Sequence, residues 1–307
     1  MPANPVLTPE RFQRESDVNR PGWGAPTGTV TGGTAPGGAG SGGGTPGAAT
    51  WPEAASAPVE RSQAMTIAGT LTATGVLFAL ILAAGAFGWG QVTQTTQYVD
   101  SATGQVVTGP GPGVVVENTT SIPGWMIVSV LVGVGLAFLT AFKPKLARIT
   151  APLYAIAYGV ALGAISAVYN NSFDGIVVQA VLATLGVFLA MFFLYATRII
   201  KVTPKYVAIV VAATFGIIAV YLVGFVASLF GTDLVFWDQP SFFGIAFSVV
   251  VVGVAAAYLA IDFDFIERAS SAGVPKYMEW YGAFGVTVTI VWLYLSILRL
   301  LALLRSN

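Results

Sequence analysis

Four carboxylates near the C-terminal end of the chain are the side chains most able to do chemistry: Asp262, Asp264, Glu267 and Glu279. The sequence holds 14 Asp and Glu residues, and the others lie in the first 60 residues or in segments without Lys or Arg. On one helix Asp264 and Glu267 would share a face, because they are three residues apart, whereas Asp262 would point elsewhere. Any chemistry is therefore to be sought among these four groups.

The same cluster has a simpler interpretation as a solvated helix end. Arg268 and Lys276 lie nearby in the sequence and would act as counter-charges. Glu279 would be stabilised by the N-terminal dipole of the helix that it begins. Because charged groups at a membrane boundary are usually in contact with water, this interpretation stays beside the chemical one.

Residue types that the sequence lacks exclude several classes of protein. There is no Cys and no His, which excludes disulfides, thiolate chemistry, the usual zinc sites and Ser-His hydrolases. Intramembrane proteases that need these residues and electron carriers with His-ligated haem are excluded for the same reason. The net charge is zero, which gives no electrostatic support to nucleic-acid binding. We therefore expect no enzyme activity, no cofactor and no nucleic-acid partner.

Seven long apolar runs must position the carboxylates. Each is long enough to cross a hydrocarbon layer about 30 Å thick, which takes roughly 20 helical residues. The composition agrees, with 55% hydrophobic residues, 9% charged residues and a mean hydropathy of +0.76. We predict an all-α fold, a polytopic bundle of seven transmembrane helices in the lipid bilayer. The predicted spans are 66–90, 124–142, 151–169, 175–197, 206–230, 241–261 and 278–304.

Positive residues in the connections predict the orientation. Lys and Arg lie between the second and third spans, the fourth and fifth, and the sixth and seventh. The other three connections contain Asp and Glu but no Lys or Arg. Because positive residues favour the cytoplasmic side, we expect a cell-membrane protein whose N-terminus, with Arg61 just before the first span, is cytoplasmic. Seven crossings would then place the C-terminus outside.

Two arginines at the end of the last span oppose this assignment. Arg299 and Arg305 would lie at the outer end, where the rule expects none. We interpret them as snorkelling side chains, because orientation is set mainly by the earlier loops. The alternative is a last span that re-enters the membrane, which would leave six crossings and a cytoplasmic C-terminus.

The chain divides into two parts of different composition. Residues 1–62 are expected to form a disordered, Gly- and Pro-rich cytoplasmic tail, since 12 of the 30 residues from 21 to 50 are Gly and no apolar period could build a core. Such a tail usually has no specific role, and a partner-binding segment at 9–20 is the alternative. Residues 63–307 are expected to form the transmembrane domain. Within its third span, Gly159 and Gly163 permit close helix packing.

Two groups of segments resemble the Bax inhibitor-1 (YccA-like) family of membrane proteins. One group consists of residues 260–267 (AIDFDFIE), 273–279 (GVPKYME) and the ending 298–301 (LRLL). The other consists of residues 154–163 (YAIAYGVALG) followed by 175–180 (GIVVQA), which are similar to the family's third and fourth helices. The likeness covers the chain except for the glycine-rich tail. It depends on the order and spacing of these pieces within seven spans.

The resemblance implies a bundle in which six helices surround a central seventh and, in bacterial members, a pH-sensitive calcium leak. The family's sensing element is a pair of aspartates, one late in the sixth helix and one in the seventh. Two facing carboxylates cannot both ionise cheaply, so they share a proton. Deprotonation would push the helices apart or admit a cation. Asp262 matches the first of these two aspartates.

This chain departs from the family pattern at the second aspartate. Aligned backwards from the C-terminal ending, the expected position falls near Thr289, and no acidic residue follows Glu279. A glutamate usual in the third helix is likewise replaced, by Tyr158. A threonine hydroxyl can form a hydrogen bond or ligate Ca²⁺, but it cannot titrate. Our hypothesis is that Asp264 or Glu279 supplies the second carboxylate, so that these two residues and Asp262 form the proton- and Ca²⁺-sensing site.

Two classes of function stay open. In the first, the protein is a pH-sensitive leak channel for Ca²⁺ or other cations, gated by the carboxylates at the inner end of the sixth and seventh helices. The acidic outer connections would attract cations. In the second, it transports nothing and is a regulatory membrane protein that binds a membrane protease or a stress-response partner. An active secondary transporter is a third class, but the sequence shows no broken helix with polar groups at mid-membrane.

Overall fold

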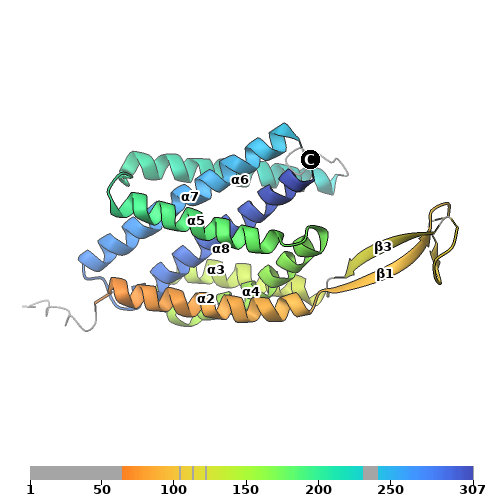
Figure 1. Cartoon of the computed structure of the whole chain (residues 1–307). Helices are drawn as coiled ribbons and strands as arrows, with labels where there is room; N and C mark the ends of the chain where they lie inside the picture. The colour runs from red at the N-terminus through yellow and green to blue at the C-terminus, as the bar shows by residue number, and fades with distance from the viewer. Residues whose placement is uncertain (1–63, 104, 113, 122, 231–240, 307) are drawn as a thin grey trace, which may run out of the picture. The chain divides into compact units, whose positions relative to one another are not determined.

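A computed structural model describes residues 64–103, 105–112, 114–121, 123–230 and 241–306 (Figure 1). Its helices are α2 (Ile67–Gly90), α3 (Trp125–Phe142), the 3₁₀ turn η2 (Pro144–Leu146), α4 (Ala147–Ser172), α5 (Ile176–Ala196), α6 (Pro204–Leu229), α7 (Phe242–Ser271) and α8 (Met278–Arg305). Its strands are β1 (Thr93–Asp100), β2 (Val106–Val107) and β3 (Val114–Ser121). Seven helices in this part of the chain are long and apolar enough to cross a membrane, which confirms the predicted fold class. The predicted tail, 1–62, lies outside the described residues.

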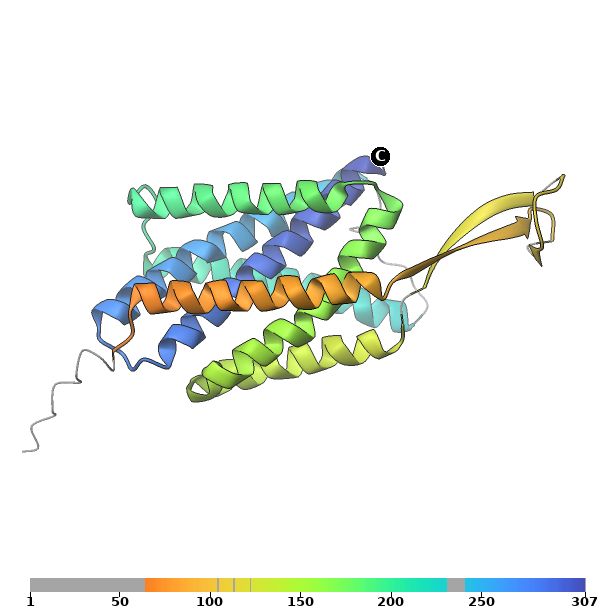
Figure 2. The ribbon, with the colours of Figure 1, turned by 60° about the horizontal axis from the view of Figure 1, so that its bottom comes forward.

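Helix α8 lies at the centre of the bundle. It packs against α2, α4, α5 and α7, and Figures 1 and 2 show it passing diagonally between them. Its Ala283, Phe284 and Val291 belong to one core cluster with residues of α2 and α4, and its Leu293 and Leu298 belong to another with residues of α5 and α7. In the most apolar part of α8, 61% of the residues are buried, compared with 17% in α3 and in α6. The last helix is therefore central, as the resemblance implies.

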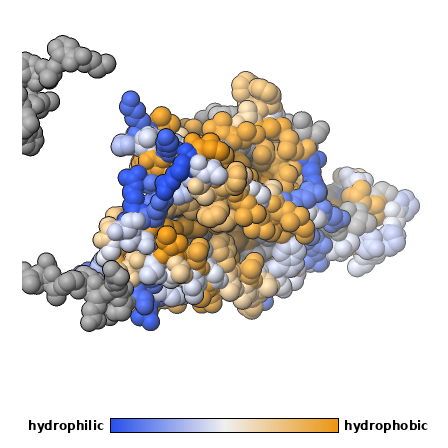
Figure 3. Space-filling view, turned by 60° about the vertical axis from the view of Figure 1, so that its left-hand side comes forward, coloured by the Kyte–Doolittle hydropathy of each residue, from blue (hydrophilic) through white to orange (hydrophobic). Residues whose placement is uncertain are grey.

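The outer surface of the helices is apolar. Large side chains such as Leu131, Leu182 and Phe215 are mostly exposed. Figure 3 shows hydrophobic residues across the middle of one face and hydrophilic residues gathered toward its two sides. An exposed apolar surface of this extent is unfavourable in water but suits lipid. The chain is thus an integral membrane protein.

Helices α2 and α4 approach so closely that only glycine fits between them. A Cβ atom built on Gly163 would lie 1.9 Å from the carbonyl oxygen of Gly85. One built on Gly88 would lie 2.0 Å from a carbonyl oxygen of α4, and one on Gly159 would lie 2.9 Å from a carbonyl oxygen of α2. The prediction that Gly159 and Gly163 serve close packing is confirmed. In lipid, where apolar burial drives little association, this close approach supplies dispersion contacts between helices.

Helix α7 continues ten residues past the predicted end of the sixth span at residue 261. No Gly or Pro interrupts the sequence between residue 261 and Gly273, which has a φ of +66° and follows the helix directly after its C-cap. Gly in this left-handed conformation commonly ends helices. Asp262, Asp264 and Glu267 consequently lie within the helix and not at its end.

The connection between α2 and α3 contains a β-hairpin that the sequence analysis does not predict. β1 pairs antiparallel with β3 along its whole length and with β2 at its far end, which gives the order β2-β1-β3. Val and Thr, which favour strands, are frequent in β1 and β3. The Asp100 carboxylate accepts hydrogen bonds from the N–H groups of Ala102 and Thr103 at 2.8 and 3.1 Å, and these bonds lower its pKa. Figure 1 shows the hairpin extending beyond the ends of the helices.

The two ends of the bundle carry different connections (Figure 1). At the end that we call the basic end, which carries the α3–α4, α5–α6 and α7–α8 connections, the N–H of Met65 donates to the carbonyl of Val274 at 2.7 Å. At the opposite end, which we call the hairpin end, Arg305 donates to the carbonyl of Asp174 at 2.8 Å and to Gln179 Oε1 at 2.9 Å. Helix α8 therefore crosses the whole bundle, and the alternative of a re-entrant last span is wrong.

Arg299 and Arg305 have protein partners, so snorkelling alone does not describe them. Arg299 Nη1 donates to the hydroxyl of Tyr221 on α6 at 2.6 Å, and its guanidinium lies 5.6 Å from the centre of the Tyr221 ring. Arg305 is bound to the start of α5. Both contacts fasten the hairpin end of α8 to helices that surround it.

The close packing of α2 and α4 predicts that Gly163→Ala is destabilising. The added methyl group would collide with backbone atoms of Gly85, and such overpacking costs about 1–3 kcal/mol of unfolding free energy. The matched control is Gly186→Ala on α5, where a Cβ atom would meet nothing within 4 Å. Thermal unfolding in detergent should show a clear loss of melting temperature for Gly163→Ala only. Equal melting of the two variants would contradict the packing.

The orientation can be tested with single cysteines, because the chain has none of its own. Ser306 at the hairpin end and Ser271 at the basic end are both exposed. In intact cells a membrane-impermeant maleimide should label Ser306→Cys, and it should label Ser271→Cys only after permeabilisation. The reverse pattern would invert the orientation. Labelling of both from one side would be incompatible with seven crossings.

Candidate functional site

Asp262 on α7 faces the central helix α8. The hydroxyl of Thr289 lies close to the carboxyl, and a Cβ atom built on Gly285 would lie 3.4 Å from Asp262 Oδ1. Asp262 Oδ2 is buried and has no hydrogen-bond partner among the described residues. A buried polar oxygen without a partner is costly. The carboxyl is therefore placed where gaining a proton, a cation or water would change its free energy strongly.

Helix α7 extends well beyond Asp262. The helix continues for nine residues beyond Asp262, to Ser271, which corresponds to about 14 Å of helix. On α8, Thr289 is eleven residues after Met278, or about 16 Å from the start of the helix. Asp262 therefore lies inside α7, just after the predicted end of the sixth span at residue 261, and its place at the membrane boundary stays a prediction.

Asp264 and Glu267 form ion pairs with arginine side chains near the basic end. Arg268 Nε lies 2.7 Å from Asp264 Oδ2, in an ion pair between residues one turn apart on α7. Glu267 accepts hydrogen bonds from the Tyr195 hydroxyl and from Arg198. Arg268 also donates to a backbone carbonyl of the α5–α6 connection at 3.1 Å. The two acids have the counter-charges of the simpler interpretation, although both lie within α7 and not at its end. Glu267 and Arg268 fasten α7 to the end of α5 and to the α5–α6 connection.

Glu279 is buried, with 5% of its surface exposed, and it caps another helix. Its Oε1 accepts from the N–H of Thr66 at 3.0 Å and from the Thr66 hydroxyl at 2.9 Å. Thr66 Oγ1 in turn accepts from the N–H of Gly69 at 2.9 Å, as the N-cap of α2. A Cβ atom on Gly69 would lie only 2.2 Å from Glu279 Oε1. The carboxylate thus lies at the N-terminal ends of both α2 and α8, where helix dipoles favour a negative charge.

The structure does not bring the three candidate sensing carboxylates into one group. Asp264 is paired with Arg268, Glu279 is bound to Thr66, and Asp262 faces Thr289. Within the described ranges, no three or more Asp and Glu side chains are placed to hold a metal ion together. Of the positions singled out from the sequence, Asp262 and Thr289 are the pair that the fold places face to face.

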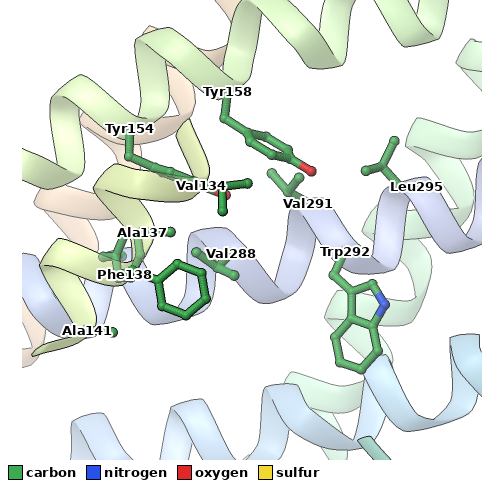
Figure 4. Close-up of a pocket in the computed structure, with 11 residues that line it drawn as sticks. Val134, Ala137, Phe138, Ala141, Tyr154, Tyr158, Val288, Val291, Trp292 and Leu295 are labelled. Carbon is green, nitrogen blue, oxygen red and sulfur yellow. The ribbon is translucent and has the colours of Figure 1, made fainter. Parts of the chain in front are cut away.

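An apolar groove of about 470 Å³ lies along another side of α8 (Figure 4). It is lined by Val134, Ala137, Phe138, Ala141, Tyr154, Tyr158, Phe284, Val288, Val291, Trp292 and Leu295. Tyr158 stacks on Tyr154 with ring centres 5.3 Å apart. None of the lining side chains is charged, and apolar walls cannot replace the hydration shell of an ion. The groove is therefore unsuited to be a cation path.

Sequence reasoning did not single out Thr66, Gly69 or Tyr195. Thr66 carries a readable signal, since a threonine just before an apolar helical run is a typical N-cap. That its partner is Glu279, 213 residues away, cannot be read from the sequence. Tyr195 and its partner Glu267 are 72 residues apart and offer no local pattern.

The sequence matches the model of a protein family described as "Bax inhibitor 1 like" over residues 4–306. This range is essentially the whole chain. Comparison with curated proteins and with solved structures found no match.

The cap formed by Glu279 predicts that Glu279→Ala lowers stability. The substitution removes both hydrogen bonds that Thr66 donates to Glu279, and hydrogen bonds of this kind contribute about 0.5–1.5 kcal/mol each to the unfolding free energy. Glu279→Gln should cost less, because the amide oxygen can still accept. Asp264→Asn is the control, since its partner Arg268 is exposed and exposed ion pairs contribute little. Thermal unfolding and limited proteolysis at residues 64–66 measure the effect. If Glu279→Ala and Asp264→Asn behaved alike, the cap would not be the stabilising contact.

Proposed function

Because the chain belongs to the Bax inhibitor 1 like family of membrane proteins, we propose that it is a pH-sensitive leak channel for Ca²⁺ or other cations, with Asp262 as its titrating group. The observation that carries the proposal is the buried oxygen Asp262 Oδ2, which has no hydrogen-bond partner in the described structure and lies against the central helix. Protons and Ca²⁺ are the ligands that compete for it, and no resident cofactor is required.

The proposed pH dependence follows from the position of Asp262 next to Thr289. When the carboxyl is protonated, it is neutral and packs against Gly285 and Thr289 of α8 at little cost. When it is ionised, the charge in a low-dielectric site requires water, a cation or a separation of α7 from α8. A hydroxyl cannot titrate, so a single proton controls the change where the family's pair of aspartates would share one. Flux should therefore increase as pH rises, with the slope of one titrating group.

Acidic residues at the hairpin end support entry of cations from that side. Asp100 stays charged because two backbone N–H groups bind its carboxylate. The α4–α5 connection adds Asp174, and neither it nor the segment between α2 and α3 contains Lys or Arg. Negative charge at a pore entrance raises the local concentration of cations. With the basic end in the cytoplasm, Ca²⁺ would pass inward.

A regulatory role without transport is the second candidate, and the hairpin favours it. β3 is an edge strand of the three-stranded sheet, and the hairpin extends beyond the helices (Figure 1). Edge strands bind extended segments of other proteins through main-chain hydrogen bonds. A membrane protease or a stress-response protein is the class of partner that this candidate requires.

The channel proposal is tested by Asp262→Asn in liposomes that contain the purified protein and a Ca²⁺ indicator. Asparagine keeps the shape of the carboxyl but cannot titrate, so the change in Ca²⁺ flux between about pH 6 and about pH 8 should disappear. The wild type should show an increase of up to about tenfold per pH unit, the limit for one titrating group. Asp264→Asn is the matched control and should keep the wild-type profile.

Two outcomes would count against the channel. An Asp262→Asn variant with the wild-type pH profile would remove Asp262 from the mechanism. A wild-type protein that passes no Ca²⁺ at any pH would favour the regulatory candidate.

A further inference from the structure

The apolar groove on α8 is open on the side that faces lipid. Its floor is formed by the buried side chains of Tyr154, Phe284 and Val291, whereas Val134 and Phe138 at its rim are exposed. Figure 4 shows that the labelled side chains come from α3, α4 and α8 and converge on one space. All three helices are membrane spans, so the groove opens within the hydrocarbon layer.

An open groove of this kind has to be filled by apolar matter. Water gains too few hydrogen-bond partners from an apolar wall to occupy it, and an empty groove would forfeit the dispersion contacts of its lining. Its volume of about 470 Å³ is in the range of sites that hold a small molecule. In a bilayer, the molecule of this chemistry that is always present is the acyl chain of a lipid.

Positive charge lies next to one end of the groove. Ala141 lines it, and the chain then turns through η2, which packs against both α3 and α8. Lys143 and Lys145 on this connection and Arg148 in the first turn of α4 are exposed. In the described part of the chain none of the three belongs to an ion pair, in contrast to Arg198 and Arg268 at the same end. These positive side chains at the membrane surface match the negative headgroup of an anionic phospholipid, and the groove beside them matches its acyl chain.

We propose that the groove and the α3–α4 connection together bind one anionic phospholipid. One acyl chain lies between α3 and α8 against Val288 and Trp292, and the phosphate is bound by Lys143, Lys145 and Arg148. Helix α3 packs mainly against α4, so the acyl chain supplies the contact between α3 and the central helix. The inference does not depend on the channel proposal, because it concerns a different face of α8.

The proposal is tested by photo-crosslinking of the full-length protein in phosphatidylcholine vesicles. Two probes are compared, a phosphatidylglycerol and a phosphatidylcholine, each with a diazirine midway along one acyl chain. Mass spectrometry should locate crosslinks on groove residues of α3 and α8, at least about fivefold more with the anionic probe. Excess unlabelled phosphatidylglycerol should compete, since a defined site is saturable.

Two sets of variants separate the headgroup site from the groove. Replacement of Lys143, Lys145 and Arg148 by Gln should abolish the preference for the anionic probe. Lys201→Gln with Lys205→Gln is the matched control, because these exposed lysines lie on the α5–α6 connection at the same end, and it should change nothing. Ala137→Trp, which fills the groove, should remove the groove crosslinks, whereas Ala208→Trp on the exposed face of α6 should leave them.

Three results would overturn the proposal. They are equal labelling of the groove by both probes, crosslinks spread evenly over the lipid-facing residues of α5 and α6, and a preference for phosphatidylglycerol that survives the triple Gln substitution. Because none of these measurements uses ion flux, failure of the lipid site and failure of the channel are distinguishable.

Discussion

Enclosure of α8 by α2, α4, α5 and α7 means that a polar group on this helix has to find its partner in the protein, since neither water nor lipid can supply one. Glu279 binds Thr66 at the N-terminal end of α2, Thr289 faces Asp262 on α7, and Arg299 binds Tyr221 on α6. These partnerships lie at the start, the middle and the end of α8. They therefore fix its height and rotation relative to the helices around it, while apolar packing fills the space between them.

Glycines lie at several places in the bundle where two groups approach each other closely. Gly163 brings the backbones of α2 and α4 together, Gly69 leaves room for the carboxylate of Glu279, and Gly285 lies beside the carboxyl of Asp262. In the first case the gain is dispersion contact between helices. At Gly69 the glycine lets a carboxyl group enter a space that a methyl group would occupy, whereas a Cβ atom on Gly285 would make an ordinary contact with Asp262 Oδ1 at 3.4 Å. Small residues here serve the placement of acids as much as the packing of helices.

Apolar length and charge placement predicted the parts of the fold that depend on the membrane. The seven spans and the packing role of Gly159 and Gly163 follow from residue types and spacing, whereas the place of Asp262 late in the sixth helix is what the family resemblance implies. The end of α7 did not follow from residue types, because the transition from apolar to polar residues after residue 261 marks the end of hydrophobicity and not the end of the helix. The partners of Glu279 and Glu267 are far away in the sequence, and only tertiary packing decides which helix end a buried carboxylate meets.

The contacts of the four C-terminal carboxylates divide them into three with bound partners and one, Asp262, whose buried Oδ2 has no hydrogen-bond partner among the described residues. Glu279 faces an N–H group and a hydroxyl at a helix N-terminus, Asp264 faces a guanidinium, and Glu267 faces a guanidinium and a phenol. Positive groups or helix-end N–H donors hold each of these three carboxylates in a fixed position. Asp262 faces the hydroxyl of Thr289, and its buried Oδ2 has no hydrogen-bond partner in the described part of the chain. A carboxyl group with so little compensation for its charge is the one whose protonation state the surrounding helices must accommodate, and α7 and α8 are the elements that would have to move.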